Sequence, residues 1–248
     1  MPEVDNITGT KHGKKNEGAV GAIIVAAGKG SRMGLGYNKV FADLRGRPVI
    51  EWTIRKFVYS QLIDTMILVI NPDEKEAMAR ICQPYINKID LIMANGGDSR
   101  QESVYNGLKA LPETVEIVLI HDGARPFVDR NIIESSIKTA KEQGAACAGI
   151  PAKDTIKIVD SKRTVQSTPE RSLMWHAQTP QSFKRSIIMK AYKNAMEKDI
   201  LGTDDASLAE LAGFPVTMFE GSSRNIKLTS ADDIILGEFF IGLSKTEF

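Results

Sequence analysis

Glycines and cations gather in one stretch near the start of the chain, directly after the apolar residues 22–26. Gly28 and Gly30 can adopt positive φ angles and let backbone N–H groups approach a ligand closely, as glycine-rich turns do when they hold phosphate oxygens. Arg32 and Lys39 add two positive charges, seven residues apart. The pattern favours a loop that neutralises a polyphosphate, and a strand-to-helix turn with two solvated cations is the alternative.

Two well-known phosphate-binding loops do not fit this stretch. A Walker A loop has four residues between its glycines and then Gly-Lys-Ser/Thr, which this stretch lacks. A dinucleotide-binding loop has Gly-x-Gly-x-x-Gly, and here Arg32 and Met33 delay the third glycine by one position. The acid at the expected distance, Glu51, follows Pro48 in a predicted helix rather than ending a strand. The stretch therefore favours a triphosphate that is cleaved over a bound dinucleotide.

Two further predicted strands end in residues that could share this site. Residues 89–93 lead into a second glycine loop, Asn95 to Ser99, and residues 117–120 lead toward Asp122 and Arg125. Because ligands bind beyond the carboxyl ends of parallel strands, we expect these segments to face the first loop. Asp122 is a candidate ligand of Mg²⁺, which prefers oxygen atoms. As alternatives, the second loop is a helix-capping turn, Asp122 is a turn former, and Arg125 pairs with Asp122 instead of reaching phosphates.

The remaining pattern predicts the elements that position these loops. Apolar segments alternate with amphipathic helices, which is typical of an α/β fold with a mostly parallel sheet flanked by helices. One helix begins after Pro48, and the strand at residues 66–70 ends in a turn where Asp73 can cap the next helix. Thr203 is the expected cap of a later helix. Near the C-terminus, Lys227 lies where a predicted strand ends and could project into the site.

The strand and helix alternation breaks after residues 145–150. Two short β-like segments, residues 155–159 and 164–167, predict a hairpin that projects from the sheet as an arm. A lone two-stranded hairpin is only marginally stable in water, so we expect it to pack against a second subunit. Trp175 and His176, which follow the arm, are expected to lie in the core.

Composition limits the class of protein. The chain has 248 residues, 42% of them apolar, and a net charge of +1, which gives no reason to expect nucleic acid or a membrane as a partner. Residues 1–18 have few apolar side chains and are predicted to be a mobile N-terminal tail, with residues 19–248 forming a single domain. Cys82 and Cys147 show no metal-ligand spacing, which favours a reducing, cytoplasmic location. The chain has no apolar segment as long as a membrane span.

Seven motifs follow one another in a specific order. They are Ala-Ala-Gly-Lys-Gly-Ser-Arg-Met, Asn-Lys-Val-Phe, Gly-Gly-Asp-Ser-Arg, His-Asp-Gly-Ala-Arg-Pro, Lys-Asp-Thr-Ile-Lys, Gln-Thr-Pro-Gln and Asn-Ile-Lys-Leu-Thr. With them, residues 19–243 resemble the 2-C-methyl-D-erythritol 4-phosphate cytidylyltransferases, which join CTP to methylerythritol phosphate and release pyrophosphate in the non-mevalonate isoprenoid pathway. The resemblance implies a Rossmann-like nucleotidyltransferase fold, Mg²⁺ as cofactor, and a homodimer clasped by an arm at about residues 153–173.

The resemblance also implies roles for individual residues. The expected catalytic cations around the triphosphate are Arg32, Lys39 and Lys227, and the expected metal ligand is Asp122. The expected nucleotide-binding residues are Ala26, Ala27, Gly28, Gly30, Gly97, Asp98, Ser103 and Asp122. The expected binding residues for the second substrate are Arg125, Thr155, Arg171, Thr179 and Lys227. Asn38 stands where many relatives have proline.

Three other functions remain open. A ribitol 5-phosphate cytidylyltransferase would use the same loops, and it is the nearest rival. From other classes, a dinucleotide-binding oxidoreductase and a non-catalytic nucleotide-binding module are the alternatives. The expected reaction needs no general base because the attacking phosphate is already ionised at neutral pH, so catalysis depends on positioning and charge neutralisation.

Overall fold

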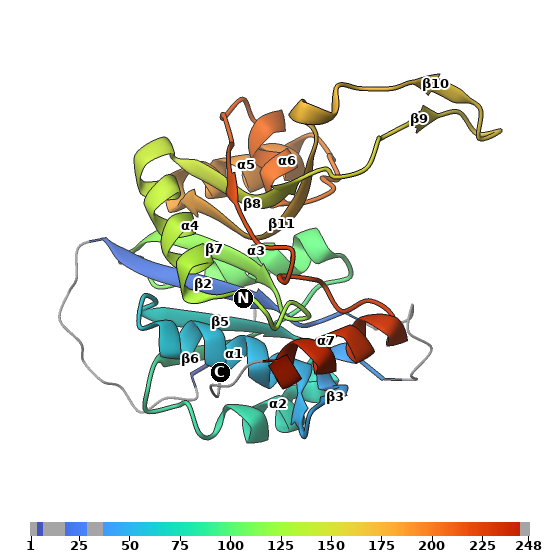
Figure 1. The fold of residues 1–248 in the computed structure, drawn as a ribbon. Coiled ribbons are helices and arrows are strands. Elements are labelled where there is room, and N and C mark those ends of the chain that lie inside the picture. The colour runs from blue at the N-terminus through green and yellow to red at the C-terminus, as the bar shows by residue number, and fades with distance from the viewer. Residues whose placement is uncertain (1–3, 7–17, 29–36, 244–248) are drawn as a thin grey trace.

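The computed structural model describes residues 4–6, 18–28 and 37–243, and it is built around one eight-stranded sheet (Figure 1). The strands follow the order β1-β6-β5-β2-β7-β11-β8-β12. β1 and β11 run antiparallel to their neighbours, and the other strands share one direction. The strands are β1 (Val4–Asn6), β2 (Ala19–Val25), β5 (Thr65–Ile70), β6 (Asp90–Asn95), β7 (Val115–Asp122), β8 (Ala145–Pro151), β11 (Trp175–Lys184) and β12 (Thr217–Glu220).

Helices cover both faces of this sheet (Figure 1). In β2, Ala22 and Ile24 pack toward one face, with residues of α1, α2 and α4, whereas Ile23 packs toward the other, with residues of α3, α5 and α6. All three side chains are fully buried. A strand that is apolar on both sides must be covered on both sides, so the predicted α/β fold with a mostly parallel sheet is confirmed. The α-helices are α1 (Val49–Ser60), α2 (Lys75–Cys82), α3 (Arg100–Ala110), α4 (Arg130–Gln143), α5 (Arg185–Glu197), α6 (Asp205–Leu211) and α7 (Ala231–Leu243).

Short elements complete the chain. Two 3₁₀ helices, η2 (Lys39–Phe41) and η3 (Pro72–Glu74), lie at the start of segments that lead into longer helices, and a third, η4 (Arg171–Leu173), precedes β11. A small hairpin, β3 (Asp43–Leu44) and β4 (Arg47–Pro48), leads into α1. Within the described ranges, none of the helices combines the length and apolar character that crossing a bilayer requires.

Strand β11 was not expected from the sequence. Its buried residues are largely polar, so they do not show the apolar alternation by which strands are recognised. Their polar atoms find partners inside the fold: Ser182 Oγ bonds Ser136 Oγ, and Gln181 Nε2 donates to Asp204 Oδ2 at 2.7 Å. Hydrogen bonding across the core therefore replaces apolar burial along this strand.

Two helix starts differ from the predicted caps. The side chain of Asn71, rather than that of Asp73, caps the turn after β5 by accepting from the Asp73 N–H at 3.2 Å. Asp204, rather than Thr203, caps α6 in a capping box with Ser207. In both cases the neighbouring Asn or Asp has the extended backbone that a cap requires.

The N-terminal segment contributes one strand. Val4–Asn6, inside the predicted mobile tail, pairs antiparallel with β6 at the edge of the sheet. Backbone hydrogen bonds make this pairing, so the scarcity of apolar residues in the segment does not prevent it. Residues 1–3 and 7–17 lie outside the described part of the chain.

The predicted arm is present as a hairpin of β9 (Ile158–Val159) and β10 (Val165–Ser167), which pair antiparallel and project from the body (Figure 1). The two strands are shorter than expected. Trp175 and His176 are exposed in the single chain because they occupy the part of β11 near the base of the arm. Their predicted core position is therefore wrong for the isolated subunit.

Candidate active site

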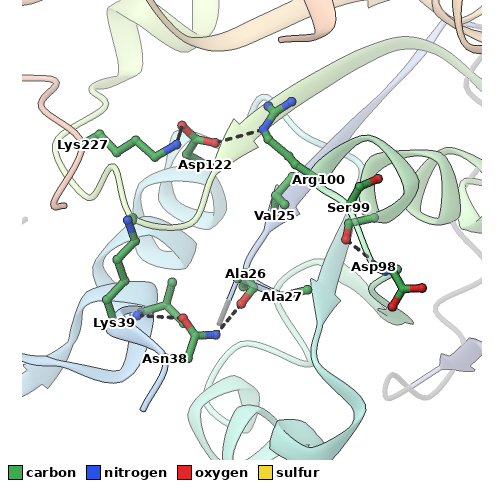
Figure 2. Close-up of a pocket in the computed structure, with 15 residues that line it drawn as sticks. Val25, Ala26, Ala27, Asn38, Lys39, Asp98, Ser99, Arg100, Asp122 and Lys227 are labelled. Atoms are coloured by element: carbon green, nitrogen blue, oxygen red, sulfur yellow. Dashed lines mark hydrogen bonds and ion pairs between the residues drawn. The ribbon is translucent and has the colours of Figure 1, made fainter. Parts of the chain in front are cut away.

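A cavity of about 340 Å³ lies beyond the carboxyl ends of β2, β6 and β7 (Figure 2). This is where ligands bind in open α/β sheets. Both glycine segments contribute to its wall, as do η2 and the end of β7. The lining residues are Val25, Ala26, Ala27, Gly28, Asn38, Lys39, Val40, Gly97, Asp98, Ser99, Arg100, Ser103, Asp122, Ala124 and Lys227.

The two glycine segments meet closely at one side of the cavity. A Cβ atom on Gly96 would lie 2.4 Å from the Cβ of Ala27, so only glycine permits this approach. The next N–H, of Gly97, donates to Ser103 Oγ at 3.0 Å, and Ser99 caps α3. The second loop is therefore both a helix-capping turn and a part of the cavity wall.

Asp122 is surrounded by cations. Its Oδ2 lies 2.8 Å from Lys227 Nζ and 3.4 Å from Arg125 Nε, and its Oδ1 lies 3.7 Å from Arg100 Nε. Burial raises the pKa of Asp122, but the charges of its neighbours outweigh burial and hold the pKa well below its usual range. The carboxylate is thus ionised at neutral pH, and it orients positive side chains beside the cavity.

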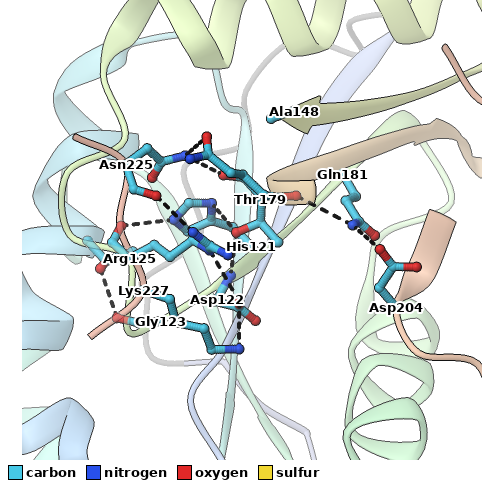
Figure 3. A network of polar contacts seen from close by, with 12 residues as sticks. His121, Asp122, Gly123, Arg125, Ala148, Thr179, Gln181, Asp204, Asn225 and Lys227 are labelled. Carbon is cyan, nitrogen blue, oxygen red and sulfur yellow. Dashed lines mark hydrogen bonds and ion pairs between the residues drawn. The ribbon is translucent and has the colours of Figure 1, made fainter. Parts of the chain in front are cut away.

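A buried polar network supports the backbone of Asp122 (Figure 3). The Thr179 hydroxyl accepts from the Asp122 N–H at 3.1 Å and donates to His121 Nδ1 at 3.0 Å. His121 Nε2 then donates to the Arg125 carbonyl at 3.1 Å, since a carbonyl can only accept. Burial lowers the pKa of His121 to about 4. This neutral, fully buried histidine holds the network together and does not reach the cavity.

Arg125 pairs with Asp122, one of the two alternatives left open by the sequence. Its Nη1 also donates to the Asn225 carbonyl at 2.8 Å, and it does not line the cavity. Thr179 is likewise behind the cavity wall, where its hydroxyl bonds the backbone of Asp122. In this chain both residues support Asp122 directly.

Lys39 enters the cavity wall from η2, and Asn38 precedes it. The side chain of Asn38 caps η2, and the residue is 4% exposed although it lines the cavity. Figure 2 shows the Lys39 side chain pointing toward the region of Lys227 and Asp122.

Arg100 is a cavity residue to which the sequence analysis gave no role. Its Nη2 lies 2.7 Å from Oδ2 of Asp205, a fully buried carboxylate that also accepts from the Tyr192 hydroxyl at 2.5 Å. Burial lowers the pKa of Arg100, but the negative charges of Asp205 and Asp122 raise it by more than burial lowers it. The pKa of Arg100 is therefore above its usual range. In the sequence, the one signal for Arg100 is its place directly after a glycine loop. Its partner Asp205 is 105 residues away, so a local pattern does not reveal the pair.

Most of the expected site residues that the structure describes come together. Those that line the cavity are Ala26, Ala27, Gly28, Lys39, Gly97, Asp98, Ser103, Asp122 and Lys227. Gly30 and Arg32 lie outside the described residues. Thr155 and Arg171 are exposed on the arm and do not line the cavity of their own chain.

The oxygen donors at the cavity determine whether it could hold Mg²⁺. Within the described ranges, the histidines, cysteines and carboxylates form no cluster of three that could hold a metal by themselves. Asp122 is an ionised carboxylate at the cavity wall, and Mg²⁺ is typically bound by one or two carboxylates together with substrate phosphates and water. The donors in the described part of the chain therefore fit a metal ion that arrives with a nucleotide and is bound partly by its phosphates.

Comparisons with known proteins agree on one family. The family model described as 2-C-methyl-D-erythritol 4-phosphate cytidylyltransferase matches residues 20–243. A protein of that name from Clostridioides difficile (strain 630) is 47% identical over 225 residues, covering 91% of this chain and 94% of the relative. Another, from Caldanaerobacter subterraneus subsp. tengcongensis, is 41% identical over 90% of this chain and 98% of its own length.

Solved structures show the same likeness. The crystal structure of 4-diphosphocytidyl-2C-methyl-D-erythritol synthase from Anaerococcus prevotii DSM 20548 superposes with a TM-score of 0.82 at 31% identity. The match covers 92% of this chain and 100% of that structure. The expected Rossmann-like nucleotidyltransferase fold is thereby confirmed.

Proposed function

Because this chain belongs to the 2-C-methyl-D-erythritol 4-phosphate cytidylyltransferase family, we propose that the cavity beyond β2, β6 and β7 is its active site. The chain is a nucleotidyltransferase of isoprenoid biosynthesis. It converts CTP and methylerythritol phosphate to the diphosphocytidyl product and pyrophosphate.

One observation carries the assignment of the site. Two glycine segments, an ionised carboxylate and three cations line a single cavity at the strand ends. Backbone N–H groups and Ser103 at one side suit a nucleoside, and Lys39, Lys227 and Arg100 suit the phosphates. Gly30 and Arg32 extend the first loop and are proposed to bind the same triphosphate.

The chemistry follows from these charges. A phosphate oxygen of the acceptor attacks the α-phosphorus of CTP, and pyrophosphate leaves on the opposite side. The phosphate is already ionised, so no residue needs to remove a proton. Lys39 and Lys227 are proposed to stabilise the negative charge that develops at the α-phosphate. Positive side chains that already face this position stabilise the transition state and so lower the activation barrier. His121 is buried behind the cavity wall and burial lowers its pKa, so we assign it to the supporting network and not to proton transfer.

We propose Mg²⁺ as the cofactor, with Asp122 as its protein ligand. The support is the donor set, an ionised carboxylate beside the expected phosphate position. Bound there, the ion would neutralise phosphate charge. EDTA should abolish activity, and excess Mg²⁺ should restore it; activity that persists in EDTA would refute a metal requirement.

The test of the function is pyrophosphate release. Purified protein with Mg²⁺, CTP and methylerythritol phosphate should release pyrophosphate in proportion to the acceptor added. A faster reaction with ribitol 5-phosphate would favour the rival acceptor. Stabilisation by NAD⁺ rather than CTP in a thermal-shift assay would favour an oxidoreductase, and CTP binding without pyrophosphate release would favour a binding module.

The arm supports a further proposal, a homodimer. Ile158, Val159 and Val165 on the arm are about half exposed, at 53%, 48% and 53%. Thr155 and Arg171 lie on or beside the same arm, away from their own cavity. We propose that the arm packs on a second subunit, where these two residues hold the acceptor phosphate.

A cytoplasmic location is proposed from the cysteines. Cys82 and Cys147 are both free and buried, and burial raises the pKa of each thiol to about 12. Such thiols are typical of a reducing compartment. Fractionation of cells of the source organism is the measurement that checks it.

A further inference from the structure

Asn38 joins three segments at the edge of the cavity (Figure 2). Its Nδ2 donates to the Ala26 carbonyl at 2.7 Å and to Glu74 Oε2 at 2.9 Å. Its Oδ1 accepts from the Val40 N–H at 3.3 Å. One side chain therefore connects the end of β2, the turn η3 and the 3₁₀ helix η2.

The contacts of Asn38 require a carboxamide. The two Nδ2 hydrogens meet two oxygen acceptors, and the oxygen meets one donor. An amide turned the other way would bring its oxygen against the carbonyl of Ala26 and the carboxylate of Glu74. A carboxylate of the same shape would do the same. Because Asn38 is only 4% exposed, water cannot readily replace a hydrogen-bond partner that its side chain loses.

The connected segments belong to different parts of the site. Ala26 lies on the nucleoside side, and its own N–H is fixed to the Val69 carbonyl of β5 at 2.8 Å. Lys39 directly follows Asn38 and is the first residue of η2. Because Asn38 anchors both the start of η2 and the end of β2, the distance from the nucleoside wall to the Lys39 backbone depends on this amide.

We propose that Asn38 is a positioning residue for the reaction, because its carboxamide sets the place of Lys39 relative to Ala26. The inference rests on the proposed function, in which Lys39 stabilises charge at the α-phosphate. Misplacing a charge by about an ångström can cost up to about a hundredfold in rate. Asn38 acts through Lys39 and touches neither reacting atom itself.

The test is a double-mutant cycle on kcat for pyrophosphate release. Asn38→Asp keeps the shape and the acceptor for Val40 but removes both donors, and it should lower kcat at least about tenfold. In a Lys39→Ala background the same substitution should change kcat less than about twofold, because there is no charge left to misplace. An equal loss in both backgrounds would overturn the proposal.

A second variant separates positioning from folding. Asn38→Ser is smaller and keeps an acceptor for the Val40 N–H, but it cannot bridge Ala26 and Glu74. It should remain folded by circular dichroism and should lose kcat in the same coupled way. Wild-type kcat in folded Asn38→Ser protein, or loss of the fold in both variants, would overturn the proposal.

Asn71 provides a matched control. It caps η3 in the same manner, by accepting from the Asp73 N–H at 3.2 Å, but it does not line the cavity. Asn71→Ser should keep this single exposed cap, because serine caps about as well as asparagine, and should leave kcat within about twofold. If the wild-type protein released no pyrophosphate, the proposed function would fail; an active wild type without coupling between Asn38 and Lys39 would refute only the positioning role.

Discussion

Single residues in this site are organised by charge. Asp122 holds Lys227 at 2.8 Å, while Arg100 is shared between Asp122 and Asp205. These positive side chains are therefore oriented before a ligand arrives, so little reorganisation is needed when phosphates enter. Preorganised charge of this kind contributes most to rate where charge develops in the transition state.

Lys39→Ala tests this principle at the residue scale. If Lys39 acts at the α-phosphate as proposed, removing its charge should lower kcat by about a hundredfold or more, with a smaller effect on CTP affinity. Steady-state kinetics of pyrophosphate release is the measurement. Lys193→Ala serves as the control, because the Lys193 side chain is 77% exposed on α5. A raised Michaelis constant for CTP with unchanged kcat would mean that Lys39 contributes uniform binding and no catalysis.

Residues of the site differ in how far the sequence could predict them. Asp122 and Lys39 stand next to strand or loop signals, so their positions at the cavity followed from local pattern and from the family motifs. Arg100 and Asn38 were not given roles, because their importance depends on partners remote in sequence, such as Asp205 and Glu74. A pattern along the chain does not contain such pairings.

Helices are joined by the ion pair between Arg100 and the buried Asp205. Arg100 begins α3, Asp205 begins α6, and Tyr192 lies in α5. Their contacts join three helices on one face of the sheet to the cavity wall. The carboxylate of Asp205 is fully buried, so its partners must supply what water would.

Asp205→Asn tests this junction. Loss of the negative charge leaves Arg100 without its nearest partner and should reduce the free energy of unfolding by about 2–3 kcal/mol, less than for a fully buried pair because Arg100 is one-third exposed. Urea denaturation measures it. Glu197→Gln is the control: it breaks the exposed Lys193–Glu197 pair at 3.8 Å and should change stability by less than about 1 kcal/mol. Equal effects would show that burial of Asp205 adds nothing.

The prediction of elements succeeded where apolar periodicity was strong and failed where it was absent. The helix after Pro48 and the strand ending at Ile70 were recognised from their buried apolar residues. β11 was not, because Gln181 and Ser182 satisfy hydrogen bonds in the core. β1 was not either, because an edge strand is held by backbone pairing with β6.

At the scale of the whole molecule, the arm formed by β9 and β10 projects away from the body of its own chain (Figure 1). Its exposed Ile158 and Val165, and the exposed Trp175 at its base, are apolar surface that a second subunit would cover. Arg171 donates to the Lys153 carbonyl at 3.1 Å, which fixes it at the base of the arm. These features motivate a site shared between subunits.

Complementation between two inactive variants tests the shared site. Lys39→Ala protein is mixed with Arg171→Ala protein after dissociation, and the dimers are reassembled. If Arg171 serves the partner's cavity, a mixed dimer has one site with both defects and one with neither. Random pairing makes about half of the dimers mixed, so about a quarter of all sites should regain full activity, while each parent stays nearly inactive.

The control mixes Lys39→Ala with Asp122→Asn. Both residues line the same cavity, so every mixed site keeps one defect and no activity returns. Mixed dimers verified by mass spectrometry that show no recovery in the first pairing would mean that Arg171 acts within its own chain or not at all.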